Sequence, residues 1–89
     1  MSEQHTSRVT AGPGGAMTDE VGVITGDLTV TTTAAPRGTA RIEVQYTDAD
    51  EWYTLTGSPV PVPAAGLGDL HERVVDAIRS GGGAEAPRA

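Results

Sequence analysis

The sequence predicts a small α+β domain, a two-layer sandwich in which a three- to four-stranded antiparallel meander carries one C-terminal helix on one face. Apolar and polar residues alternate over residues 40–46, which is typical of a half-buried strand. Apolar residues then recur every three or four positions over residues 67–78, which is typical of an amphipathic helix. The 89 residues are 37% apolar and 3% aromatic, so they fill one small core.

The predicted domain covers residues 19–80 and lies between two segments without a periodic apolar pattern. Residues 1–18, with the run Gly12-Pro13-Gly14-Gly15, are expected to form a disordered N-terminal arm. Residues 81–89 are rich in Gly, Ala and Pro and are expected to form a disordered tail.

The first strand is predicted within residues 21–33, which are dense in β-branched side chains. Ile24, Leu28, Val30 and Thr32 share one face at the two-residue period of a strand. The valines before Ile24 have the opposite phase, so a bulge or turn is expected near Gly26.

The second and third strands are predicted at residues 40–47 and 52–56, joined as a hairpin by a polar turn at residues 48–51. The prolines at 59, 61 and 63 then remove the N–H donors of one side of any strand formed there. Residues 59–63 are therefore expected to form an edge strand or a polyproline-like strap. The helix is expected over residues 67–80, with Gly81 as its C-terminal stop.

The composition excludes several classes of function. The chain has no cysteine, so it has neither a disulfide framework nor a cysteine nucleophile. Its formal charge of −6 is unfavourable for binding nucleic acid or an anionic membrane. Neither a signal peptide nor a membrane-spanning run occurs, so the protein is expected in the cytoplasm. No sequence motif indicates a cofactor.

Two groups of polar residues could support chemistry, and each has a simpler interpretation. His71 titrates near neutral pH, but it borders the apolar stripe of the helix and is expected to cover the rim of the core. Asp48, Asp50 and Glu51 place three carboxylates on one turn without the spacing of a calcium loop. A solvated turn is expected there, and neither a metal site nor a catalytic residue is predicted.

Trp52 is the candidate contact residue. If Tyr53 and Leu55 point toward the core, Trp52 and Thr54 lie on the face that the helix leaves uncovered. The opposite register would bury Trp52 in the core, and the sequence leaves both registers open.

The function predicted from these features is non-enzymatic: an acidic protein-interaction module, such as a regulatory or accessory subunit, that assembles through an open sheet edge or face. The partner is a protein or a second copy, and the residues expected to contact it are Trp52, Val30, Thr32 and Thr54. A homodimer would form through the edges of the first strand or through the faces that carry Trp52. The alternative is an acidic decoy that occupies a cationic, nucleic-acid-binding site on a partner. An enzyme centred on His71 is the least favoured function.

Overall fold

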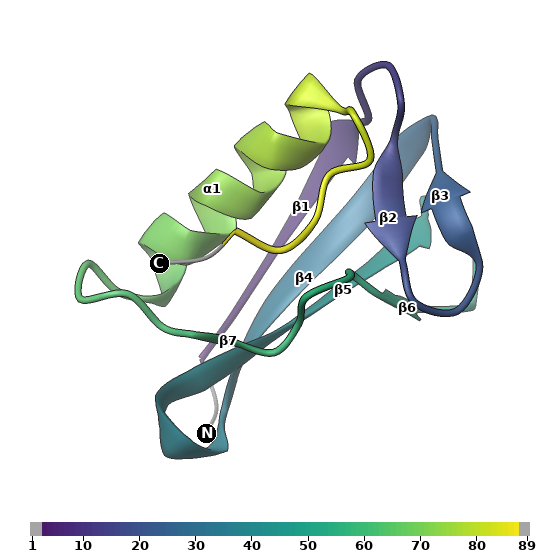
Figure 1. The fold of residues 1–89 in the computed structure, drawn as a ribbon. Coiled ribbons are helices and arrows are strands. Elements are labelled where there is room, and N and C mark those ends of the chain that lie inside the picture. Colours follow the sequence, from purple (N-terminus) through teal and green to yellow (C-terminus); the bar gives the residue numbers. More distant parts are fainter. Residues whose placement is uncertain (1–2, 88–89) are drawn as a thin grey trace.

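The computed structural model describes residues 3–87 and places one helix across one face of a twisted antiparallel sheet (Figure 1). The main sheet has the strand order β1-β4-β5-β6, β7 also pairs with β5, and β2 and β3 form a separate hairpin. The strands are β1 (Gln4–Thr10), β2 (Ala16–Thr18), β3 (Gly22–Ile24), β4 (Asp27–Ala35), β5 (Thr39–Tyr46), β6 (Tyr53–Thr54) and β7 (Val60–Pro61). The helix α1 spans Leu67–Ser80. The predicted α+β, two-layer fold is confirmed.

The two long central strands, β4 and β5, follow the predicted alternation. They pair antiparallel from Leu28 opposite Tyr46 to Ala35 opposite Thr39. Gly26 separates β3 from β4 and has a φ of 89°, a conformation that glycine adopts without strain. The predicted interruption at this glycine is therefore confirmed.

The third and fourth strands are shorter than the sequence predicts. β6 has two residues, after which Leu55 bridges to Thr18 of β2. β7 has two residues and pairs with β5 through Val60 and Pro61. These short strands still close the side of β5 that faces away from β4.

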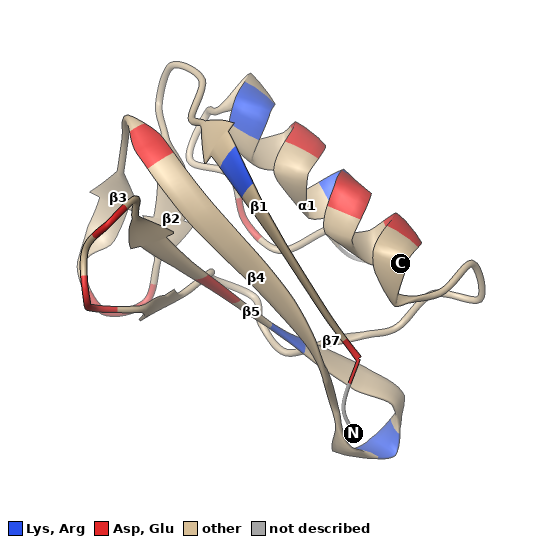
Figure 2. Cartoon of the chain, turned by 180° about the vertical axis from the view of Figure 1, so that it is seen from behind, with Lys and Arg blue, Asp and Glu red and all other residues tan. Residues whose placement is uncertain are grey.

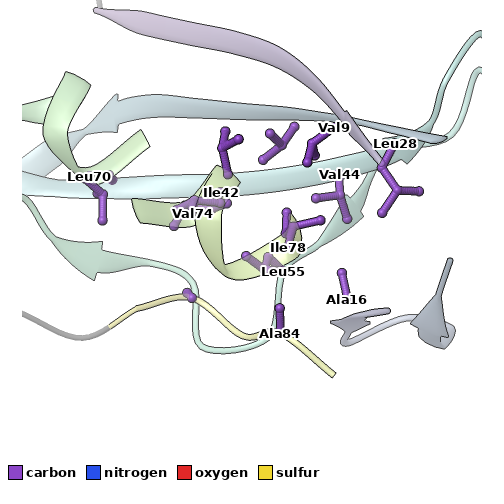
Figure 3. Close-up of a cluster of buried hydrophobic side chains, with 14 of the residues drawn as sticks. Val9, Ala16, Leu28, Ile42, Val44, Leu55, Leu70, Val74, Ile78 and Ala84 are labelled. Carbon is purple, nitrogen blue, oxygen red and sulfur yellow. The ribbon is translucent and has the colours of Figure 1, made fainter. Parts of the chain in front are cut away.

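The helix has the predicted bounds, and Gly81 ends it with a φ of 79° while its N–H donates to the carbonyls of Ala77 and Ile78. The buried side of the helix packs on β1 and β4. Its core residues meet the inward side chains of the sheet in one apolar cluster (Figure 3). The fully buried large side chains of this cluster are Ile24, Leu28, Val30, Ile42, Val44, Leu55, Val74 and Ile78.

The prediction that residues 1–18 are disordered is wrong for residues 3–18. Residues Gln4–Thr10 form β1, which pairs along its whole length with Asp27–Thr33 of β4, and Ala16–Thr18 form β2. The inward positions of β1 are His5, Ser7 and Val9, so two of three are polar and give no apolar alternation. Pairing with β4, distant in the sequence, makes this segment a strand.

The prediction of a disordered tail is wrong for residues 81–87. Ala84 bridges in parallel to Ala16, and both Ala84 and Ala86 are buried. The chain turns back through three glycines with positive φ at positions 81–83, and an added Cβ at Gly81 would clash with the Pro13 carbonyl. Residues 1–2 and 88–89, which the same two predictions cover, lie outside the described residues.

Candidate functional site

The structure places Val30 and Thr32, two of the predicted contact residues, in the interior of the sheet. Both lie on β4, both are 0% exposed, and β4 is paired with β1 on one side and with β5 on the other. These residues therefore cannot contact a partner through the edge of β4. The prediction that two copies pair through the edges of this strand is therefore wrong, because β1 already occupies that edge.

Trp52 and Thr54 lie outside the core, as the first of the two registers predicts. Leu55 is fully buried and Tyr53 packs against the core, while Trp52 is 42% exposed. The Thr54 N–H and hydroxyl both donate to the Glu20 carboxylate at 2.7 Å. Hydrogen bonds from the Thr54 side chain and backbone lower the pKa of Glu20. Thr54 is therefore already engaged within the chain.

The unpaired edge of the main sheet belongs to β1. The Ala34 N–H donates to the Glu3 carbonyl, and the Ala11 N–H donates to the Gly26 carbonyl. Because hydrogen-bonded pairs alternate in an antiparallel ladder, the backbone groups of odd-numbered β1 residues point toward β4. Those of Gln4, Thr6 and Arg8 point away from it. Within the described chain no strand or loop pairs with this outer side of β1.

A polar network lies behind this edge, where β1, β4 and α1 meet. His71 is buried, and its Nε2 lies 2.8 Å from Ser7 Oγ while its Nδ1 lies 2.8 Å from Thr32 Oγ1. The His5 ring stacks on the His71 ring with centroids 5.6 Å apart, and His5 Nε2 lies 2.8 Å from Glu3 Oε2. The network satisfies both ring nitrogens of His71, as a buried imidazole requires.

Burial is the main cause that lowers the pKa of His71, with a further contribution from the charge of nearby His5, while Glu72 acts in the opposite direction. His71 is therefore neutral at pH 7. His71 lies on the buried side of the helix at 6% exposure, which confirms that its ring covers the rim of the core. The sequence could not reveal its two hydroxyl partners, because they come from strands 64 and 39 positions away.

An open groove of about 760 Å³ runs between the outer side of β1 and one side of α1. Its strand wall is His5 and Ser7, and Val75 and His71 contribute buried surface from the helix. The remaining lining residues lie along one side of α1: Gly68, Asp69, Glu72, Asp76 and Arg79. Figure 2 shows the charged positions that follow this side of the helix beside β1. The free edge and the groove are therefore adjacent parts of one surface.

The rim of the groove is acidic, with three carboxylates against one guanidinium. Arg79 Nη1 donates to Asp76 Oδ1 at 2.8 Å, and Arg73 Nε lies 2.9 Å from Asp69 Oδ2. Glu72 has no cation within ion-pair distance in the part of the chain that the structure describes. Glu72 is thus the unneutralised charge of this rim.

The hydrogen bond between Ser7 and His71 resembles a nucleophile and its general base, but the third member differs. In the tautomer with its proton on Nδ1, His71 donates to Thr32 and accepts from Ser7. A threonine hydroxyl cannot stabilise an imidazolium as the carboxylate of a hydrolase triad does. The network orders the floor of the groove and lacks the charge that would drive proton abstraction.

Asp48, Asp50 and Glu51 are exposed, as expected of a solvated turn. Residues 3–87 contain no group of three His, Asp or Glu side chains placed to hold a metal ion. The one α-helix among them is too short and too polar to cross a membrane.

No model of a known protein family, no curated protein and no solved structure matches this chain.

Proposed function

We propose that this protein is a non-enzymatic interaction module, such as an accessory or regulatory subunit, that accepts an extended strand of a partner protein at the free edge of β1. The observation that carries the proposal is the unpaired row of backbone groups at Gln4, Thr6 and Arg8. An extended segment placed there would continue the sheet with main-chain hydrogen bonds. The groove beside the edge would receive its alternate side chains.

The edge lacks the features by which proteins usually prevent strand addition. β1 contains neither proline nor lysine and runs for seven residues, longer than many edge strands. Its single cation, Arg8, is held by Asp27 of the neighbouring strand at 2.9 Å. An approaching backbone therefore meets seven regular residues and no unpaired charge on β1 itself.

The acidic decoy has less support. Of the surface carboxylates, those of Asp27, Asp69 and Asp76 are each paired with an arginine, which weakens the negative field that a decoy needs. The dimer through Trp52 faces also lacks an extended apolar surface, since β1, β4 and β5 present mainly Thr, Arg, Glu and Gln on that side. Strand addition at β1 is therefore the function that we propose.

The test is a pair of substitutions at the middle of the free edge. Thr6→Pro removes an N–H that points away from β4, while Thr6→Ala keeps it and serves as the control for the lost hydroxyl contact with Thr31. A library of random peptides displayed on phage is selected against the wild-type protein. We expect binders whose affinity falls at least about tenfold with Thr6→Pro and remains with Thr6→Ala.

Amide hydrogen exchange supplies the second measurement. Without peptide, the amides of Thr6 and Arg8 should exchange fast and those of Ser7 and Val9 slowly, because only the latter donate to β4. A bound peptide should protect Thr6 and Arg8. Binders that are indifferent to Thr6→Pro, or the absence of any binder, would contradict strand addition.

A further inference from the structure

We propose that the groove beside β1 selects a partner segment that carries an arginine or lysine side chain toward helix α1, where it pairs with Glu72. This inference rests on the function proposed above and names the chemistry of the partner. It follows from the register of the edge, the charges of the groove and the residues that a second copy could offer.

The register determines where the side chains of an added strand would point. Because His5 and Ser7 direct their backbone groups toward β4, the residues opposite them on an added strand occupy non-hydrogen-bonded positions. Side chains at such positions lie closest together and on the same face. His5 and Ser7 line the groove. Every second side chain of the partner would therefore enter the groove and face α1.

The charges of the groove determine which side chains are favourable there. Asp69 and Asp76 already have arginine partners, whereas Glu72, one helical turn from each, has none among the described residues. Of the three carboxylates in the lining, this one is therefore the most favourable partner for a cation that enters between β1 and α1. An acidic side chain would meet three carboxylates against one guanidinium.

A second copy of this chain fits the groove less well than another protein. The β1 strand of a second copy would present His5, Ser7 and Val9 on the helix side, and its only cation, Arg8, would point to the opposite face. Antiparallel pairing of two β1 strands would also bring two acidic helix rims toward each other. The basic extended segment therefore belongs to a different protein.

The experiment uses synthetic peptides of about seven residues, the length of β1, in which threonine alternates with one varied residue. The varied residue is arginine, glutamine or glutamate, and binding to the full chain is measured by fluorescence anisotropy at low and high salt. We expect the arginine peptide to bind best, the glutamate peptide to bind worst, and the difference to shrink in high salt.

Three variants locate the interaction. Glu72→Gln should weaken the arginine peptide about fivefold and leave the glutamine peptide unchanged, as expected for one partly exposed ion pair. Glu43→Gln makes the same charge change on the face of β5 that points away from the helix. It should change the affinity of neither the arginine nor the glutamine peptide. Thr6→Pro should weaken all peptides.

The outcomes separate the two proposals. Suppose that Thr6→Pro weakens binding but that the arginine and glutamine peptides bind equally well. This result would overturn the cationic preference and leave strand addition standing. Binding that ignores Thr6→Pro would overturn strand addition itself. A stable dimer in light scattering that Thr6→Pro dissociates would show that a second copy occupies the edge, and would overturn the inference of a basic partner.

Discussion

The two edges of the main sheet differ in how the chain completes them. On the outer side of β5 the backbone is covered: the Ile42 N–H donates to Ser58 Oγ, and the Leu55 and Val62 N–H groups donate to carbonyls of β5 and of the turn before it. On the outer side of β1 no described residue supplies such a partner. The closed edge also holds apolar groups, because Leu55 and Val60 are buried there.

The two edges also differ in what they contribute to the core. The closed edge contributes side chains to the core, and its prolines leave few donors for a further strand. The open edge contributes mainly a polar network and leaves its outer backbone groups to solvent or to a partner. Apolar residues are therefore concentrated at the closed edge, where they stabilise the fold, while the edge of β1 is polar, regular and accessible.

The largest effect should come from removal of residues 1–15, which deletes β1 and converts β4 into an edge. The deletion leaves β4, which carries the buried Leu28 and Val30, unpaired on one side, and it removes Ser7 and His5 from around His71. We expect loss of the cooperative unfolding transition in circular dichroism. A melting temperature close to that of the full chain would show that β1 is dispensable.

The closed edge should be sensitive where it is buried and tolerant where it is exposed. Leu55→Ala removes a fully buried side chain and should cost about 2–5 kcal/mol in the free energy of unfolding, measured with urea. Trp52→Ala, three residues earlier and 42% exposed, is the control and should change it by less than about 0.5 kcal/mol. Equal costs would mean that Trp52 supports the fold.

The smallest effect should be a pH dependence at the open edge. Burial lowers the pKa of His71 below its ordinary value of 6.5, so the unfolded chain binds a proton more readily than the folded one. The resulting stability is present above pH 6.5 and is lost as the pH falls through the lower, folded-state pKa. The groups around the ring are His5, Ser7, Thr32 and Glu72.

The measurement is urea unfolding between about pH 7.5 and pH 5, above the range where most carboxylates titrate. We expect stability to fall toward pH 5 in the wild type and the slope to flatten in His71→Gln. His5→Gln is the comparison variant: it leaves His71 and its burial in place and removes only the lesser cause of the lowered pKa, so most of the slope should remain. A slope unchanged in His71→Gln would place the titrating group elsewhere.

Periodic apolar patterns predicted the elements whose burial is local and regular. The alternation of Ala40, Ile42 and Val44 predicted β5, and the helical repeat of Leu67, Leu70, Val74 and Ile78 predicted both bounds of α1. The β-branched run predicted β4, and Gly26 its beginning. In each case a side chain's own hydropathy shows which face it occupies.

The candidate site could be predicted only in part. His71 was identified at the rim of the core, and an open edge was expected, but it was assigned to the strand of Val30 and Thr32. That error has a physical cause: the inward positions of β1 are filled by His5 and Ser7, whose polarity hides a strand from any hydropathy pattern. Ser7 hydrogen-bonds His71 and His5 stacks on the same ring, so both inward positions depend on a residue distant in the sequence.

The sequence by itself therefore determined the fold class, the helix and the two long strands β4 and β5, because these depend on the local spacing of apolar residues. The tertiary structure alone decided which strand lies at the edge, that residues 81–87 pack beside residues 13–17, and that a groove lies between β1 and α1. These features depend on backbone hydrogen bonds and polar contacts between distant segments, and such contacts leave no periodic pattern in the chain.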